Sequence, residues 1–274
     1  MSPSAPLEPL DLSAAELVLD LLISHPERAL SVQALARAAE VMGIATPSVR
    51  VALTRLLQQG RIEKAERGRY ALRAGGNPLQ YEVEHWFDKE RRLRPWSHGW
   101  IVAHSVDARL DRTSAKHHAH ALHLQGFRPL ASQLWVRPDN LADSVEAMRQ
   151  TLLRLGLAPE SAVFRGQDFD EATTRRMMGL WEVAAIRTGY EQARQALGRS
   201  LERLERMPLA QAACETLLLG RTVIRGIVRD PLLPEEILPS AERRALLDAM
   251  RHYQDNGKRL WLRVLEEPAL ALAA

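Results

Sequence analysis

Apolar residues recur every three or four positions through the first quarter of the chain, a spacing that predicts short amphipathic helices. A first helix opens at Ser13, whose side chain can cap the free N–H groups, and it ends at His25-Pro26. A second helix opens at Ser31, and Gly43 marks a tight turn after it. We therefore expect two helices that lead through a short turn into a third.

The third helix has clear boundary signals at both ends. Thr46 is its expected N-cap, Pro47 suits the first helical position because its missing N–H costs nothing there, and Gly60 can adopt the left-handed conformation that ends a helix. The apolar positions that share one face of this helix are Val49, Leu53, Leu56 and Leu57. The opposite face is polar and basic, which a helix that only fills a core would not need.

Two short strands follow at residues 61–64 and 69–72, around a turn in which Gly68 can take a positive φ. Charge is polarised here: residues 48–73 hold seven Lys or Arg and two Glu, whereas residues 1–47 hold two Arg and six acidic residues. A basic face binds the DNA polyanion by releasing its counterions. Three helices and a basic hairpin therefore predict a winged helix-turn-helix domain at residues 1–74, with double-stranded DNA as its partner.

Particular side chains of the third helix and the hairpin are expected to contact DNA. An arginine can bond guanine through two parallel hydrogen bonds, a geometry that lysine cannot copy. The helix contributes Ser48, Arg50, Val51, Thr54 and Arg55, and the hairpin contributes Lys64, Arg67 and Arg69 for the phosphates. The alternative, in which Arg50 and Arg55 are only solvated helix residues, stays open at this point.

A break at residues 74–78, Ala-Gly-Gly-Asn-Pro, separates this domain from an expected linker and docking segment at residues 75–98. Three tryptophans in and just after this segment are expected to pack the first domain onto the next part of the chain, although a ring such as Trp86 could instead stack on a ligand. They are Trp86, Trp96 and Trp100.

Residues 99–167 alternate between strand and helix periodicities. The expected order is strand 100–106, helix 112–125, strands 127–130 and 133–137, helix 141–155 and strand 162–165. This order predicts a ferredoxin-like α+β domain, a fold that hosts many activities and proves none.

Residues 168–274 predict a helical domain, with helices at 171–197, 209–229 and 241–265. The three prolines of residues 229–239 preclude one continuous helix. Leu232, Leu233, Ile237 and Leu238 have apolar surface to bury, which favours a specified turn over a loose linker. The whole chain is thus expected to be α+β.

Composition narrows the class of protein further. Among 274 residues there is one cysteine, Cys214, which excludes an internal disulfide framework and a four-cysteine zinc site. The first residues lack the basic start and apolar core of a secretory signal, and no apolar run of 18 residues exists, so we expect a cytoplasmic protein without a membrane partner. Neither a G-x-S-x-G elbow nor a nucleotide-binding glycine motif occurs, so we expect no enzyme, no catalytic residue and no cofactor.

Three stretches in this order resemble the PaaX family of transcriptional repressors. They are SVRVALTRLLQQGRI with GRYAL, then WSHGWIVAHSVD with LHLQGFRPLASQLWVRP, and finally RDPLLPEEILP. The resemblance covers nearly the whole chain. It implies a homodimeric repressor of aromatic-acid catabolism, such as phenylacetate catabolism, that binds a palindromic operator. Release from that operator would follow binding of an aryl-CoA thioester, which is phenylacetyl-CoA in the founding members.

An effector of this kind needs cations for its phosphates and an apolar slot for its acyl group. One helical stretch offers both kinds of side chain, although they could equally form a solvated edge beside a core face. The candidate effector residues are Arg175, Arg176, Trp181 and Arg187.

Two other interpretations remain. His117, His120 and His123 recur every three residues and could share a helix face, which would suit a metal-responsive regulator; a partly exposed helix that tolerates neutral imidazole is the plainer alternative, and we assign no metal site. Asp107 ends the first strand of the expected ferredoxin-like domain, where spacer-acquisition nucleases of that fold carry an acidic residue. One aspartate cannot hold two catalytic metals alone, so a turn or cap role is the plainer alternative here too.

Overall fold

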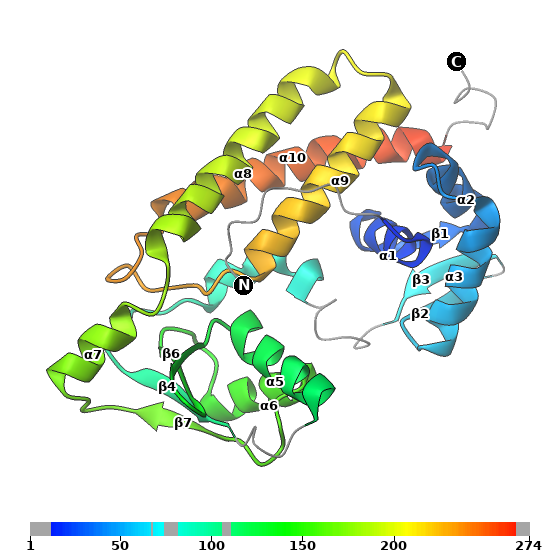
Figure 1. Ribbon diagram of the computed structural model, residues 1–274. Coiled ribbons are helices and arrows are strands. Elements are labelled where there is room, and N and C mark those ends of the chain that lie inside the picture. The colour runs from blue at the N-terminus through cyan, green and yellow to red at the C-terminus, as the bar shows by residue number, and fades with distance from the viewer. Residues whose placement is uncertain (1–11, 67, 74–81, 106–110, 267–274) are drawn as a thin grey trace. The chain divides into compact units, whose positions relative to one another are not determined.

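A computed structural model describes residues 12–66, 68–73, 82–105 and 111–266 of the chain. It is a mixed α+β protein with two small antiparallel sheets (Figure 1). Its contacts group the described residues into two units. The N-terminal unit comprises residues 12–73, 192–224 and 246–266, and the central unit comprises residues 82–191 and 225–245.

The first part of the N-terminal unit, residues 12–73, is called the head below. Its elements are α1 (Ala14–Ser24), β1 (Ala29–Ser31), α2 (Val32–Val41), α3 (Thr46–Gln58), β2 (Ile62–Glu66) and β3 (Arg69–Leu72). The three strands form an antiparallel sheet in the order β1-β3-β2. The expected helices and hairpin are confirmed, and β1 is an addition that pairs Leu30 with Tyr70.

Local chemistry sets the boundaries of the head's helices. Ser13 and Glu16 form a reciprocal capping box at the start of α1, and the Ser31 hydroxyl accepts from the Ala34 N–H at 3.1 Å at the start of α2. Gly43 and Gly60 have φ values of 68° and 64°, which lets the chain turn sharply at either end of α3. The expected role of both glycines is confirmed.

The predicted N-cap of α3 is wrong by one residue. Ala45 occupies the cap position and has no side-chain capping bond. Its carbonyl accepts from the Ser48 N–H at 2.9 Å, so the first turn closes one residue earlier than expected. The Thr46 hydroxyl instead donates to the Glu40 carboxylate at 3.4 Å.

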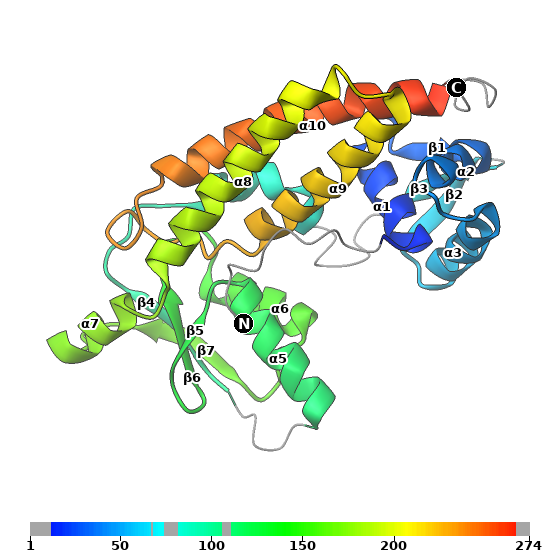
Figure 2. The same ribbon diagram turned by 45° about the horizontal axis from the view of Figure 1, so that its top comes forward.

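Three long helices contribute residues to both units: α8 (Val183–Leu204), α9 (Leu209–Val228) and α10 (Ala241–Glu266). Figure 2 shows α8 and α9 converging at the loop that joins them. Within the N-terminal unit the Ser200 hydroxyl lies 2.8 Å from both the Glu215 carboxylate and the Tyr253 hydroxyl, which joins all three helices. Among the described residues, no helix combines the length and apolar character that crossing a membrane requires.

The apolar core of the head includes side chains from the end of the chain. Ala213 of α9 and Trp261, Val264 and Leu265 of α10 belong to the same buried cluster as Leu17, Leu35 and Leu53. Arg221 of α9 donates to the carboxylates of Glu16 and Asp20 on α1. The sequence did not predict this grouping, and the division into four segments at 1–74, 75–98, 99–167 and 168–274 stays a prediction.

The central unit is built around the second sheet. Its elements are the 3-10 helix η1 (Trp86–Arg92), β4 (Trp100–His104), α5 (Arg112–Leu124), β5 (Arg128–Ala131), β6 (Leu134–Pro138), α6 (Val145–Leu155), β7 (Ala162–Gly166) and α7 (Glu171–Met178). The strand order is β5-β6-β4-β7, with every neighbouring pair antiparallel. Ile101 and Ala103 of β4 share one buried cluster with Leu122 of α5 and Leu152 of α6, which shows that both helices cover the same face (Figure 1). The expected strand and helix order is confirmed.

The prediction of one helix at residues 171–197 is wrong, because two helices occupy this stretch. α7 ends at Met178 and α8 begins at Val183, because Trp181 turns into the core between them and is 4% exposed. Its ring stacks on Trp100 with 6.3 Å between centroids, and Trp100 in turn meets Trp96 edge to face at 5.3 Å. The burial expected of Trp86, Trp96 and Trp100 is confirmed, and their role in joining two domains stays a prediction.

The proline-rich segment after α9 is a specified turn, as expected. Leu232, Leu233 and Leu238 are each at most 4% exposed, and Ile237 is half-buried. Asn140 holds the turn by donating its amide N–H to the Leu232 carbonyl at 2.7 Å.

Candidate nucleic-acid interface

Helix α3 separates its side chains into a buried and an exposed face. Val49, Leu53 and Leu56 are at most 3% exposed and pack in the core of the head. All five helix residues assigned to DNA from the sequence are exposed: Ser48, Arg50, Val51, Thr54 and Arg55. The apolar spacing therefore presents these five side chains together on the outer face of one helix.

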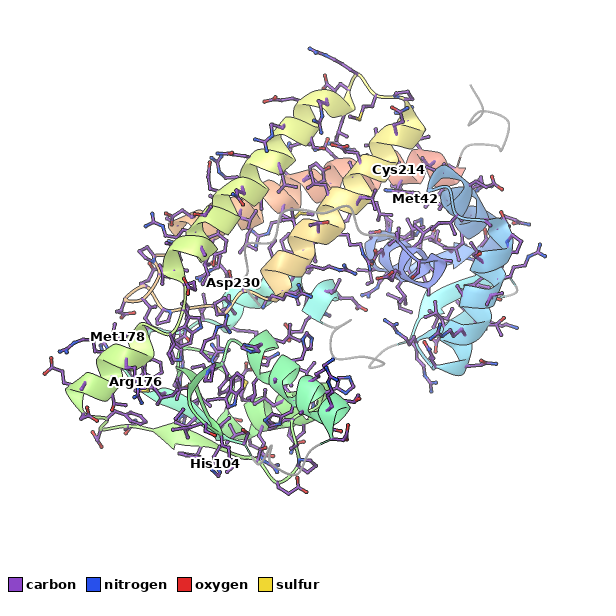
Figure 3. All side chains as sticks on the ribbon, viewed as in Figure 1. Met42, His104, Arg176, Met178, Cys214 and Asp230 are labelled. Atoms are coloured by element: carbon purple, nitrogen blue, oxygen red, sulfur yellow. The ribbon has the colours of Figure 1, made fainter. Side chains whose placement is uncertain are left out.

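The turn that leads into α3 is fixed by several contacts. The Ile44 N–H donates to the Ala39 carbonyl at 2.7 Å across the turn. From α9, the Cys214 thiol donates to the Val41 carbonyl at 3.1 Å, and Figure 3 labels Cys214 close to Met42 at this turn. Burial raises the pKa of the Cys214 thiol, so this side chain packs and bonds as a neutral group. The direction in which α3 leaves α2 is thus held by both backbone and side-chain contacts.

The two arginines on the outer face of α3 have no hydrogen-bond or ion-pair partner in the part of the chain that the structure describes. Among the described residues, neither Arg50 nor Arg55 makes a hydrogen bond or ion pair through its guanidinium group. The Thr54 hydroxyl donates to the Arg50 carbonyl at 3.1 Å and keeps its oxygen lone pairs for an incoming donor. These guanidinium groups are available to an anionic partner without breaking an internal contact.

The hairpin residues differ from one another. Lys64 is exposed on β2, opposite Tyr70 of β3. Arg69 is half-buried, forms an ion pair with Glu27 and donates to the Ala29 carbonyl at 3.2 Å. The pKa of Glu27 is lowered chiefly by the hydrogen bond from Arg69. Arg69 therefore ties β3 to the segment before β1, and Arg67 lies outside the described residues.

The candidate effector residues lie on α7, on α8 and in the segment between these helices. Arg175 forms an ion pair with Glu171 at 2.5 Å, and the Arg187 Nε donates to the Glu242 carboxylate at 3.0 Å. Trp181 is buried, and its indole N–H donates to the Gly126 carbonyl at 3.3 Å. Arg176 is exposed on α7 (Figure 3). An effector role for these four residues stays a prediction.

The histidines of α5 do not gather around one point. His118 is buried, and its Nδ1 accepts from the Ala158 N–H at 3.0 Å. His123 lies edge to face against Trp135 with 5.0 Å between centroids, and burial lowers its pKa. Within the part of the chain that the structure describes, no group of three or more His, Cys, Asp or Glu side chains could hold a metal ion. His117, His120 and His123 therefore form no metal site of this kind, and Asp107 lies outside the described residues.

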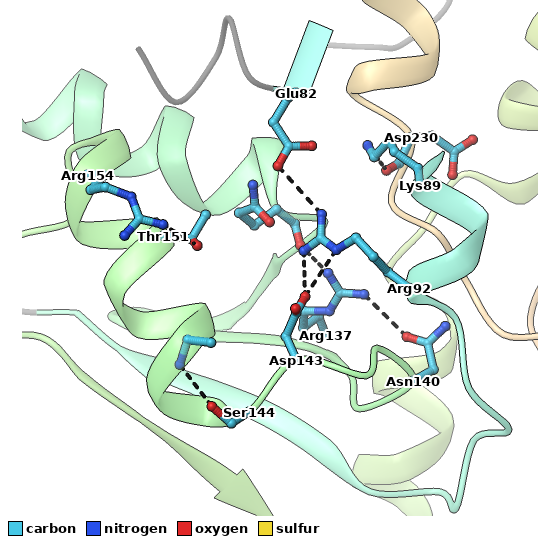
Figure 4. A network of polar contacts seen from close by, with 12 residues as sticks. Glu82, Lys89, Arg92, Arg137, Asn140, Asp143, Ser144, Thr151, Arg154 and Asp230 are labelled. Carbon is cyan, nitrogen blue, oxygen red and sulfur yellow. Dashed lines mark hydrogen bonds and ion pairs between the residues drawn. The ribbon is translucent and has the colours of Figure 1, made fainter. Parts of the chain in front are cut away.

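A second concentration of charge lies inside the central unit, where the sequence analysis named no site (Figure 4). Arg137 is 2% exposed and donates to the Gln125 carbonyl at 2.5 Å and to the Asn140 side chain at 3.2 Å. The ammonium of Lys89 donates to the Val228 and Ile227 carbonyls at 2.6 and 3.3 Å, and burial lowers the pKa of Lys89 to about 8. These cations bind groups of the protein itself, so they stabilise the fold.

Comparison with known proteins finds a likeness in structure and none in sequence. No protein-family model matches the chain, and no curated protein matches its sequence. The chain is similar in structure to uncharacterized protein Rv0674 from Mycobacterium tuberculosis, with a TM-score of 0.62 and 20% sequence identity. The match covers 93% of this chain and 98% of that one. At this identity the likeness shows a shared fold over nearly the full length of both chains, and it assigns no activity.

Proposed function

We propose that this chain is a DNA-binding transcriptional regulator of the PaaX type, and that it represses an aromatic-acid catabolic operon. In this proposal the head is a winged helix-turn-helix domain, α3 is its recognition helix, and the β2–β3 hairpin is its wing. The central sheet and its two helices are then a ferredoxin-like domain, and the β5-β6-β4-β7 order with two helices on one face supports that assignment.

The outer face of α3 carries the proposal. Two guanidinium groups that bind no other described residue, two hydroxyl side chains and one valine share this face, and Lys64 of the hairpin is exposed as well. Phosphates and base edges in the major groove are partners for such side chains. A helix that served only the core of the head would not need unpaired basic residues there.

Gene control by a small molecule forms the second part of the proposal. Two heads in a homodimer would match two operator half-sites, and an aryl-CoA thioester would favour a dimer geometry that no longer fits their spacing. The sequence resemblance to PaaX repressors supports this part. The proposed effector works only through a difference in its affinity for the two geometries.

The DNA-binding part is tested by selecting duplexes from a random library with the purified protein and measuring affinity at fixed salt. Arg50→Ala is expected to lower the affinity for the selected duplex by about 1–3 kcal/mol. The control Arg199→Ala removes a likewise exposed arginine from α8 and is expected to bind as the wild type does. If Arg50→Ala and Arg199→Ala bind equally well, α3 is not the recognition helix.

The effector part is tested by a thermal-shift screen of aryl-CoA thioesters and free aromatic acids. A thioester that binds the folded protein is expected to raise Tm in proportion to the logarithm of its concentration. The same compound is then expected to release the selected duplex in a gel-shift assay. If no compound raises Tm or releases DNA, the proposal of an aryl-CoA effector is wrong. The proposal that the protein binds DNA is unaffected by that result.

A further inference from the structure

An exposed valine lies in the middle of the outer face of α3. Val51 is 68% exposed, and among the described residues only Phe87 and Phe164 are comparable exposed large apolar side chains. A single exposed apolar residue is ordinary on a protein surface. The position of Val51 relative to its basic neighbours makes it informative.

Helix geometry gives that position. Successive residues of an α-helix are separated by about 100°, so the side chains of Val51 and Thr54 point within about 30° of the direction opposite to the buried face. Arg50 and Arg55 then lie about 70° to either side of that direction. If α3 enters a groove, Val51 therefore approaches its floor while the two arginines approach its sides or flanking bases.

Local helix stability gives no reason for a valine at this position. β-Branched side chains lose rotamer freedom in a helix, and alanine, lysine or glutamate would favour an exposed helix position more. Val51 is 68% exposed and belongs to no buried cluster of the described residues, so burial does not offset this preference. A residue that breaks a local rule without compensation in the fold is expected at a functional surface.

We infer that Val51 is a specificity-determining residue that contacts the 5-methyl group of a thymine in each operator half-site. This inference rests on the proposed function. On the major-groove edges of the four bases, the thymine methyl is the apolar group, whereas the other features are hydrogen-bond donors and acceptors. The apolar side chain of Val51 lies between two arginines. A thymine methyl group can contact Val51 while neighbouring guanines or phosphates bind the two arginines.

The test uses deoxyuridine, which pairs with adenine as thymidine does but lacks the methyl group. Each thymine of a duplex selected by the wild-type protein is replaced in turn, and affinity is measured at one salt concentration. We expect one thymine in each half-site whose replacement weakens binding about fourfold, equivalent to about 0.8 kcal/mol for one buried methyl-sized group. Val51→Ala is expected to bind the thymine and deoxyuridine duplexes equally well.

Two controls separate this role from a general loss of binding. Gln58→Ala changes an exposed residue of the same helix and is expected to retain the fourfold penalty for deoxyuridine. Val51→Ala is expected to have an unchanged or higher Tm, because alanine is the better helix former.

The outcomes distinguish the inference from the proposal beneath it. If the wild type selects no sequence from the library, the proposed function fails and the inference fails with it. If it selects a sequence but no thymine-to-deoxyuridine change matters, the proposed function stands and Val51 does not read a methyl group. A penalty that persists in Val51→Ala means that another group contacts the methyl, which also overturns the inference.

Discussion

The arginines of α3 and the arginine inside the central sheet use the same functional group in opposite ways. Arg50 and Arg55 are exposed and, within the described residues, bind no protein group. Arg137 is 2% exposed, and its guanidinium donates to Gln125, Pro138 and Asn140. A buried cation needs protein acceptors for its N–H groups. An exposed cation stays hydrated, and its N–H groups are free to bind a partner. An arginine that is buried and bonded to protein groups therefore stabilises the fold, whereas an exposed arginine without such bonds is available to a partner.

Removal of the buried arginine gives the largest expected effect. In Arg137→Met the carbonyls of Gln125 and Pro138 and the side chain of Asn140 lose their donor in a dry environment, at about 1–3 kcal/mol for each acceptor left without a partner. We expect a loss of about 3 kcal/mol or more in the free energy of unfolding, measured by urea denaturation. The matched substitution Arg55→Met on α3 is expected to change stability by less than about 0.5 kcal/mol. Equal losses in both variants would refute the distinction between the two kinds of arginine.

The buried Lys89 is expected to make the stability of the protein depend on pH. The pKa of Lys89 is lowered from 10.5 to about 8 because burial penalises the charged ammonium. Between about pH 8 and 10.5 the unfolded chain binds this proton and the folded protein has released it. The folded state therefore gains stability as pH rises through this window, and loses that contribution as pH falls towards 8.

Lys89→Met lacks this titration and serves as the reference. The free energy of unfolding of the wild type, relative to that of Lys89→Met, is expected to rise between about pH 8 and 10.5. Parallel curves for the two proteins in urea titrations would show that the carbonyls of Ile227 and Val228 hold Lys89 charged throughout.

Features that a short stretch of sequence determines were predictable. The apolar spacing of Val49, Leu53 and Leu56 was enough to place the outer face of α3. The glycines at 43 and 60 were enough to place the turns at its two ends, and Gly68 was enough to place the turn of the hairpin. The cap at Ala45 was missed because Thr46 is the better capping residue, and only the backbone bond from Ser48 reveals where the helix starts. One residue of difference did not change which side chains face outward.

Features that depend on distant contacts were not predictable. β1 is only three residues long, and its partner β3 lies some forty residues further along the chain. Arg137 stands in a strand whose sequence pattern does not indicate that Gln125 and Asn140 surround its guanidinium. The interruption before α8 contains Trp181, which stacks on the distant Trp100, whereas the segment itself has an unbroken helical periodicity. The effector candidates were chosen because that stretch offers both cations and apolar side chains, and their role stays a prediction.

The smallest expected effect concerns two cations of the hairpin. Lys64 is exposed and is expected to contact a phosphate, whereas Arg69 already pairs with Glu27 and Ala29. Lys64→Ala is therefore expected to weaken binding to all duplexes by a similar factor, without changing sequence preference or Tm. The slope of log affinity against log salt concentration is expected to fall in magnitude by about 0.9 for each phosphate that the protein no longer neutralises.

Arg69→Ala supplies the contrast within the same hairpin. Loss of its ion pair removes a link between β3 and the segment before β1, so we expect a small drop in Tm and a smaller change in salt slope than for Lys64→Ala. Fluorescence anisotropy with one labelled duplex over a salt series measures both slopes. If Arg69→Ala changes the salt slope more than Lys64→Ala does, the Arg69 guanidinium leaves Glu27 to bind DNA. An ion pair within the protein would then not distinguish arginines that stabilise the fold from arginines that bind a partner.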